Sequence, residues 1–190
     1  ELPAKALDEI LTDHAEVFTE LKEYYKQTSE SDTTKISFYE DTYSLYNLYR
    51  FAHYYEEAYG KYIWLKSGAS LVIEHTEAMT VIDVNTGSVL KKKKQEDTLF
   101  YQINREAAKE IARQLRLRNI SGIIMIDFIN MKDTAQKEKL LSLLDSECKK
   151  DRVHCNVIDM TALNLVEMTR SKVRKPLHEQ IRSCMKNNRS

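Results

Sequence analysis

The sequence has little of what flexible linkers, signal peptides and membrane spans require. Its 190 residues include only 4 glycines and 2 prolines, so long flexible connections are not expected. Apolar runs stay well short of the roughly 20 residues that cross a bilayer, so we expect no membrane span. The first residues, ELPAKALDEI, lack the regions of a signal peptide and an initiator methionine. These features favour a piece of a longer protein.

Cysteine is also scarce. Cys148, Cys155 and Cys184 are odd in number and widely spaced, which argues against a disulfide framework and indicates a reducing compartment such as the cytoplasm. Because no CxxC pair is present, a self-contained zinc site is not expected either.

The formal net charge of zero conceals a strong segregation of charge along the chain. Residues 1–60 contain 5 Lys and Arg against 13 Asp and Glu, a net charge of −8. Residues 61–190 contain 24 against 16, a net charge of +8. This division predicts two units, of which the basic one is the candidate for contact with a polyanion.

Two apolar stretches, residues 71–85 and 122–131, each contain an aspartate near the end of a predicted strand. Asp83 and Asp127 would be costly inside buried strands unless their charges were compensated. A divalent metal is the simplest shared compensator. The structural alternatives are that Asp83 belongs to a hairpin exit and that Asp127 bonds a neighbouring backbone amide.

The oxygen-rich character of this pair favours Mg²⁺ over zinc. Asn85 lies on the same strand face as Asp83 and can orient a carboxylate or a metal-bound water. Carboxylate and amide oxygens suit a hard cation that keeps several waters. A metal held in this way among basic residues suits hydrolysis of a phosphodiester.

Hydrophobic periodicity predicts an α/β (α+β) fold with a mixed β-sheet flanked by helices. In the first 60 residues the expected elements are a short helix or helix-to-strand segment over 4–12, a helix over 14–27, a strand over 35–39 and a tyrosine-rich helix over 42–59. Later strands are expected at 61–65, 71–75, 79–85, 123–129, 152–158 and 163–168, and helices at 98–118, 134–149 and 176–185. We expect the tyrosines to pack their helix, with a base-stacking surface as the alternative.

Three groups of basic residues are candidates for binding a polyanion such as a nucleic-acid backbone. They are the run Lys91, Lys92, Lys93 and Lys94, the helical stripe Arg105, Lys109, Arg113 and Arg116, and the residues Arg170, Lys172 and Arg174. The alternatives are that the stripe is an ordinary solvated face, or that it packs against missing parts of a longer protein.

Four blocks of sequence resemble the catalytic region of the ribonuclease E/G family, in the same order and at similar spacing. They are WLKSG at 64–68, VIEHTEAMTVIDVNTG at 72–87, NREAAKEIARQLRLRNISGIIMIDFINM at 104–131 and LVEMTRSKVRKPL at 165–177. The resemblance implies a DNase I-like catalytic subdomain over 61–177, followed by a tail over 178–190. More weakly, residues 1–60 resemble the end of a ribonuclease H-like subdomain.

The same resemblance implies function. It implies Mg²⁺-dependent endonucleolytic cleavage of single-stranded RNA in RNA processing or decay. Asp83 and Asp127 match the metal-binding aspartates of the family, and Asn85 matches the residue that holds the first aspartate in place.

The sequence also departs from the family pattern. The N-terminal OB-fold domain and 5′-end sensor are missing, and the family's FIDM reads FINM here, with Asn130 in place of the acid. Only Cys184 follows the KPL segment, where some members have a paired-cysteine zinc link that supports an oligomer, so a homo-oligomer stays an open alternative. A second functional hypothesis is a fragment that binds RNA or a protein without cleaving.

Overall fold

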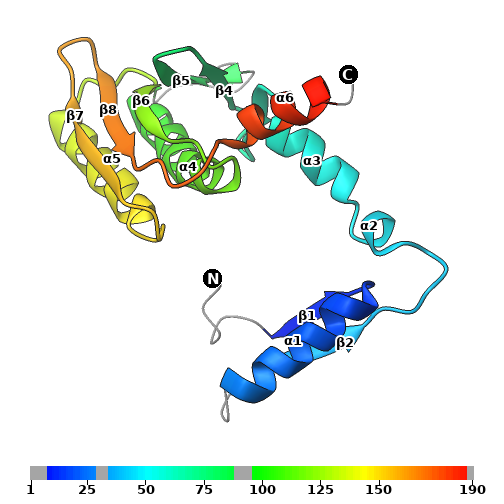
Figure 1. The fold of residues 1–190 in the computed structure, drawn as a ribbon. Helices are drawn as coiled ribbons and strands as arrows, with labels where there is room; N and C mark the ends of the chain where they lie inside the picture. Colours follow the sequence, from blue (N-terminus) through cyan, green and yellow to red (C-terminus); the bar gives the residue numbers. More distant parts are fainter. Residues whose placement is uncertain (1–7, 29–33, 88–95, 188–190) are drawn as a thin grey trace. The chain divides into compact units, whose positions relative to one another are not determined.

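The computed structural model describes residues 8–28, 34–87 and 96–187 (Figure 1). The chain divides into two compact units, residues 1–55 and 56–190. Within the described residues, no helix has both the length and the apolar character needed to cross a membrane.

The first unit contains a small βαβ arrangement. Strands β1 (Glu9–Thr12) and β2 (Lys35–Phe38) pair in parallel, and helix α1 (Ala15–Thr28) lies between them in the chain. The ring centroids of Phe18 and Phe38 are 5.4 Å apart, which fixes the helix to the strands through apolar contact. The helix and strand predicted over 14–27 and 35–39 are confirmed.

The single tyrosine-rich helix predicted over 42–59 is wrong. The structure has two helices, α2 (Leu45–Leu48) and α3 (Phe51–Tyr59), and Arg50 between them has a left-handed φ of 51°. No glycine or proline marks this break in the sequence. The packing expected of the tyrosines is found only in part: the rings of Tyr46 and Tyr49 contact Phe51, but the exposed fractions of the tyrosines range from 50% to 60%. These residues are Tyr43, Tyr46, Tyr49, Tyr54, Tyr55 and Tyr59.

The second unit is built on a six-stranded mixed sheet in the order β3-β4-β5-β6-β8-β7. Its central strands β5 and β6 are parallel, whereas every other neighbouring pair is antiparallel. The bounds are β3 Tyr62–Trp64, β4 Ser70–His75, β5 Met79–Asn85, β6 Gly122–Asp127, β7 Cys155–Met160 and β8 Leu165–Arg170. The predicted mixed sheet with flanking helices is confirmed.

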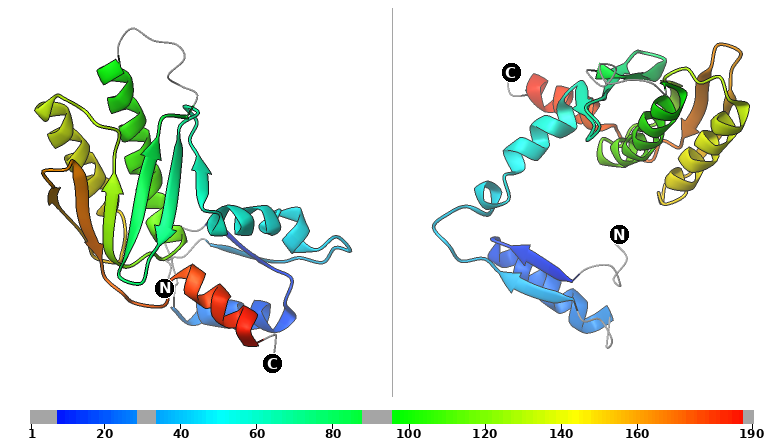
Figure 2. Two further views of the ribbon diagram at one scale, coloured as in Figure 1. Left: turned by 90° about the horizontal axis from the view of Figure 1, so that it is seen from above. Right: turned by 180° about the vertical axis from the view of Figure 1, so that it is seen from behind.

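Helices α4 (Glu96–Leu117) and α5 (Thr134–Cys148) cover one face of this sheet (Figure 2). Every second residue of a strand points into the layer between the sheet and these helices, so Ile82, Ile124 and Ile126 are completely buried. Burial of each such side chain contributes about 1.5–3 kcal/mol. The apolar face of α4 supplies the other side of this core through Ile103, Ala107, Ile111 and Leu115.

The other face of the sheet is not covered by α4 or α5, and we call it the open face. The sequence predicts that the strand over 123–129 is covered on both faces, and this prediction is wrong. On β6, Ile124 is buried while its neighbour Ile123 is 50% exposed. The continuous apolar run therefore hides an ordinary inside–outside alternation.

The last helix, α6 (Leu177–Asn187), follows β8 and belongs to the second unit. Its first backbone N–H donates to the carbonyl of Arg118 at 2.9 Å, and the ring of His178 stacks on His75 at 3.8 Å. The helix predicted over 176–185 is confirmed. Strands β7 and β8 begin two to three residues later than predicted.

Candidate active site

Asp83 and Asp127 lie side by side at the same end of the two parallel strands. Asp83 is the pairing partner of Asp127 in the register of β5 and β6. Because directly paired residues on adjacent strands point to the same face, both carboxylates project from the open face. The structure therefore brings together the two aspartates that the sequence identified, and we call them the carboxylate pair.

The reasoning that these aspartates need compensation because they are buried is wrong. Asp127 is exposed and Asp83 is half-buried. Neighbouring atoms still desolvate the Asp127 carboxyl in part, and this effect, followed by the charge of Asp83, raises its pKa above the ordinary value. The electrostatic problem at this site is thus mutual repulsion as well as partial loss of solvent.

Asn85 contacts the carboxylate pair directly. Its side-chain N–H donates to Oδ2 of Asp83 at 2.6 Å, across two residues on the same face of β5. No backbone amide of a described residue donates to either carboxylate, so the structure does not favour the hairpin-exit and backbone-capping alternatives. The amide of Asn85 instead limits the rotation of the Asp83 carboxylate and leaves its other oxygen available.

The side chains at this site suit Mg²⁺ completed by waters better than a metal that needs three or more protein ligands. Among the described residues, no group of three or more His, Cys, Asp and Glu side chains could enclose a metal. Mg²⁺ keeps several waters and is often bound through one or two carboxylates, so a pair of aspartates is a sufficient protein contribution. A cation there would also relieve the repulsion within the carboxylate pair.

The four predicted cations on α4 are in different situations. Arg113 is already paired, with Glu57 and Glu110 both at 2.8 Å. Arg116 donates to the backbone carbonyl of Glu147 at 3.4 Å. Arg105 and Lys109 are exposed and form no ion pair with a described residue. Because α4 covers the face opposite the carboxylate pair, this stripe cannot act as one continuous track beside it.

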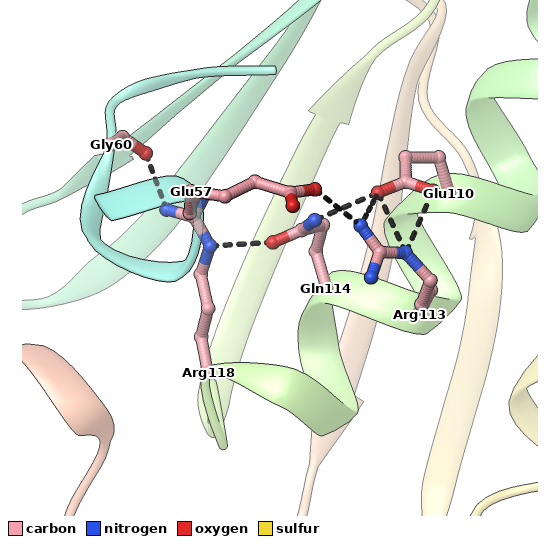
Figure 3. Close-up of polar contacts among 6 residues, drawn as sticks. All are labelled: Glu57, Gly60, Glu110, Arg113, Gln114 and Arg118. Atoms are coloured by element: carbon pink, nitrogen blue, oxygen red, sulfur yellow. Dashed lines mark hydrogen bonds and ion pairs between the residues drawn. The ribbon is translucent and has the colours of Figure 1, made fainter. Parts of the chain in front are cut away.

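Arg113 belongs to a polar network that joins α3 to α4 (Figure 3). At its centre is Arg118, which is 4% exposed and donates to the carbonyls of Gly60 at 2.7 Å and Glu57 at 3.1 Å. Its Nε donates to Gln114 at 2.6 Å. These bonds satisfy carbonyls at the C-terminal end of α3, so the network serves structure.

The basic residues at the end of β8 and just after it lie far from the carboxylate pair. Leu165 is paired with Asp127, whereas Arg170 is paired with Gly122, and these positions are about 17 Å apart along the strand. Arg170 is 4% exposed and binds Asp151 at 2.9 Å, so its guanidinium is unavailable to RNA, contrary to the sequence prediction. Lys172 and Arg174 are exposed.

Two sequence predictions lie outside what the structure describes. Lys91, Lys92, Lys93 and Lys94 fall in the gap between the described ranges. The side chain of Cys184 is likewise not described. By contrast, Cys148 is buried and Cys155 is half-buried, and both are free thiols.

A comparison of the chain with models of known protein families finds a match over most of its length. The model of the family described as "Ribonuclease E/G family" matches residues 1–173. This chain belongs to the ribonuclease E/G family. The resemblance noted in the sequence is therefore confirmed.

Members of the family from several bacteria are similar to the chain over most of its length. Ribonuclease G of Escherichia coli strain K12 is 38% identical over 171 residues, which cover 90% of this chain and 35% of the relative. Ribonuclease G of Haemophilus influenzae is 39% identical over 171 residues with the same coverage. Ribonuclease E of a Nostoc species is 34% identical over 176 residues, 91% of this chain and 26% of the relative. The chain thus spans about a third of the length of the ribonuclease G relatives.

Sequence reasoning missed two residues of the open face near the carboxylate pair. Tyr62 and Trp64, on edge strand β3, are 62% and 73% exposed. The alternation in KYIWL, with Ile63 and Leu65 buried between exposed aromatic residues, was the available signal. It could not be linked to the aspartates without the strand register.

Proposed function

We propose that this chain is the catalytic part of a Mg²⁺-dependent endoribonuclease that cleaves single-stranded RNA in the cytoplasm. The observation that supports it most is the direct pairing of Asp83 with Asp127 at one end of β5 and β6, with Asn85 bonded to Asp83. Membership of a family whose relatives are named ribonuclease G and ribonuclease E supports the choice of RNA.

In this proposal Asp83 and Asp127 hold Mg²⁺ and Asn85 positions the Asp83 carboxylate. Bound there, Mg²⁺ would supply a water of lowered pKa as the nucleophile and neutralise charge on the phosphate. The scissile phosphate would then lie on the open face, beside the ends of β5 and β6. Lys91–Lys94, Arg105, Lys109, Lys172 and Arg174 remain candidates for contact with more distant phosphates.

The test compares isosteric variants of the carboxylate pair. Asp83→Asn and Asp127→Asn each remove one charge without removing volume, and we expect each to slow Mg²⁺-dependent cleavage of an unstructured RNA by at least about 100-fold, since loss of even an outer-shell partner costs 10–100-fold. Circular dichroism should show an unchanged fold. Glu77→Gln is the matched control, because Glu77 is an exposed carboxylate at the other end of β5.

The alternative function, RNA binding without cleavage, predicts a different result. RNA would bind with a steep dependence on salt, and no products would appear with Mg²⁺ or disappear with a chelator. Cleavage at the wild-type rate by Asp83→Asn would reject the assignment of the site.

A further inference from the structure

The open face presents two large aromatic side chains close to the carboxylate pair. Tyr62 and Trp64 both project from β3, and most of each side chain is exposed to solvent. The 73% exposure of Trp64 is unusual, because burial of an indole ring lowers the free energy of the folded state. The Lys61 ammonium lies 5.7 Å from the centroid of the Tyr62 ring, and most of this flat apolar surface is open to solvent.

The strand register places these rings in line with the carboxylate pair. Tyr62 is paired with Val72, Val72 with Asp83, and Asp83 with Asp127, so these residues form one row across the open face. Two strand spacings of roughly 4.8 Å put the Cα atoms of Tyr62 and Asp83 about 10 Å apart.

The next row of the open face repeats this relation. Trp64 is paired with Ser70, and Ser70 is paired with Asn85, the residue that bonds to Asp83. Both rings are consequently one intervening strand away from the proposed catalytic residues, and a nucleotide next to the scissile phosphate can reach them.

Trp64 also lines a groove at the edge of the sheet that contains charges of both signs. The groove has a volume of about 440 Å³ and is lined by residues of α3, β3, the turn after β3 and α4, among them the acidic Glu57, Glu106 and Glu110. Lys66 and Lys109 line it and form no ion pair with a described residue, whereas its Arg113 is neutralised by glutamates. Because α4 lies on the covered side of the sheet, these ammonium groups are at the edge next to Trp64 and not beside the carboxylate pair. At that edge they suit a phosphate farther along a bound RNA strand.

We propose that Tyr62 and Trp64 form a stacking platform for unpaired bases that flank the scissile phosphate. This inference rests on the proposed function and adds the feature that makes the site select single-stranded RNA. Base–aromatic stacking accepts any base because every base has a flat face, and a base within a duplex is already stacked on its neighbours. The platform thus gives affinity with little sequence preference and disfavours duplex substrates.

The chain provides its own reporter for this proposal, because Trp64 is the only tryptophan. The emission of Trp64 is followed while an unstructured RNA oligonucleotide is added to the whole chain, with chelator present so that the RNA stays intact. We expect saturable quenching by this RNA and little quenching by the same oligonucleotide annealed into a duplex.

Variants then measure how much the rings contribute. Trp64→Ala and Tyr62→Ala should each weaken binding of a labelled single-stranded RNA by about 10-fold, whereas Trp64→Phe and Tyr62→Phe keep a flat ring and should retain most affinity. Leu163→Ala is the control, since Leu163 is 79% exposed and is not in the rows of the carboxylate pair. It should bind RNA as the wild type does.

The outcomes separate this inference from the proposed function. If Asp83-dependent cleavage occurs but RNA leaves Trp64 emission unchanged, the platform is rejected and the endoribonuclease proposal stands. If RNA quenches Trp64 but no cleavage depends on Asp83, stacking stands and the proposed function is rejected. Emission that responds to protein concentration and not to RNA would overturn the platform in favour of an interface between copies of the chain.

Discussion

The two faces of the second unit's sheet are built from the same strands but differ in burial and in polarity. The face under α4 and α5 is a closed apolar core, in which Ile82, Ile124 and Ile126 are completely buried. The open face carries Asp83 and Asp127 in direct register. Because the strand period is two, buried core residues alternate along β5 and β6 with residues of the open face, where the proposed site lies. Substitution of neighbouring residues should therefore have very different effects.

The largest contrast is expected between two adjacent isoleucines of β6. Ile124→Ala should lower the free energy of unfolding by about 2–5 kcal/mol, because it leaves a cavity in the closed core. Ile123→Ala, at a side chain that is 50% exposed, should cost at most about 1 kcal/mol. Urea denaturation of both variants measures the difference. Equal losses would mean that the two faces are not distinct in packing.

A smaller effect, on activity and not on stability, is expected at Asn85. Asn85→Ala removes the 2.6 Å bond to Asp83 and should reduce Mg²⁺-dependent cleavage by about 10–100-fold, as loss of outer-shell partners does. Thermal unfolding should change little, since Asn85 is exposed. Recovery of activity at high Mg²⁺ concentration would show that the residue acts through the metal site. Unchanged activity would exclude a positioning role.

The covered face also contains a titrating group, His75, beside His178 of α6. Burial, then the charges of His178 and Arg118, lower the pKa of His75 to about 4. An unfolded histidine titrates near pH 6.5, so between about pH 6.5 and 4 the unfolded state takes up a proton that the folded state does not. The contribution of neutral His75 to the free energy of unfolding is complete above about pH 6.5 and is lost as the pH falls toward 4.

His75→Gln tests this dependence, because glutamine can keep a bond to Thr80 without titrating. We expect the variant to lose about 1 kcal/mol less stability than the wild type over that pH range, after allowance for solvent screening of a partly exposed ring. Chemical denaturation at several pH values measures it. Parallel stability curves for the two proteins would show that His75 does not contribute.

The smallest effect concerns the stability of the open face without metal. Partial desolvation and the charge of Asp83 raise the pKa of Asp127, so its ionisation at neutral pH disfavours the folded state. Asp127→Asn should then raise the melting temperature slightly without metal. Addition of Mg²⁺ should stabilise the wild type and leave the variant unchanged, because a ligand stabilises only the state that binds it. Equal responses to Mg²⁺ would place the metal elsewhere.

Local periodicity predicted most of the elements, because the patterns of β5, α4 and α5 are strong. It failed where the decisive interaction is distant in sequence. The break at Arg50 carries no glycine or proline, and the apolar run of β6 concealed that Ile123 faces outward. Arg170 resembles an RNA-binding residue until its buried bond to Asp151 is seen.

The sequence by itself determined the family, the mixed sheet and the two aspartates, since each is written in short contiguous blocks. Only the tertiary structure decided that Asp83 and Asp127 are direct neighbours, that Asn85 bonds to the first of them, and that Tyr62 and Trp64 share their rows. The physical reason is that strand register and face are set by packing between segments far apart in the chain, and a single strand's pattern does not contain that information.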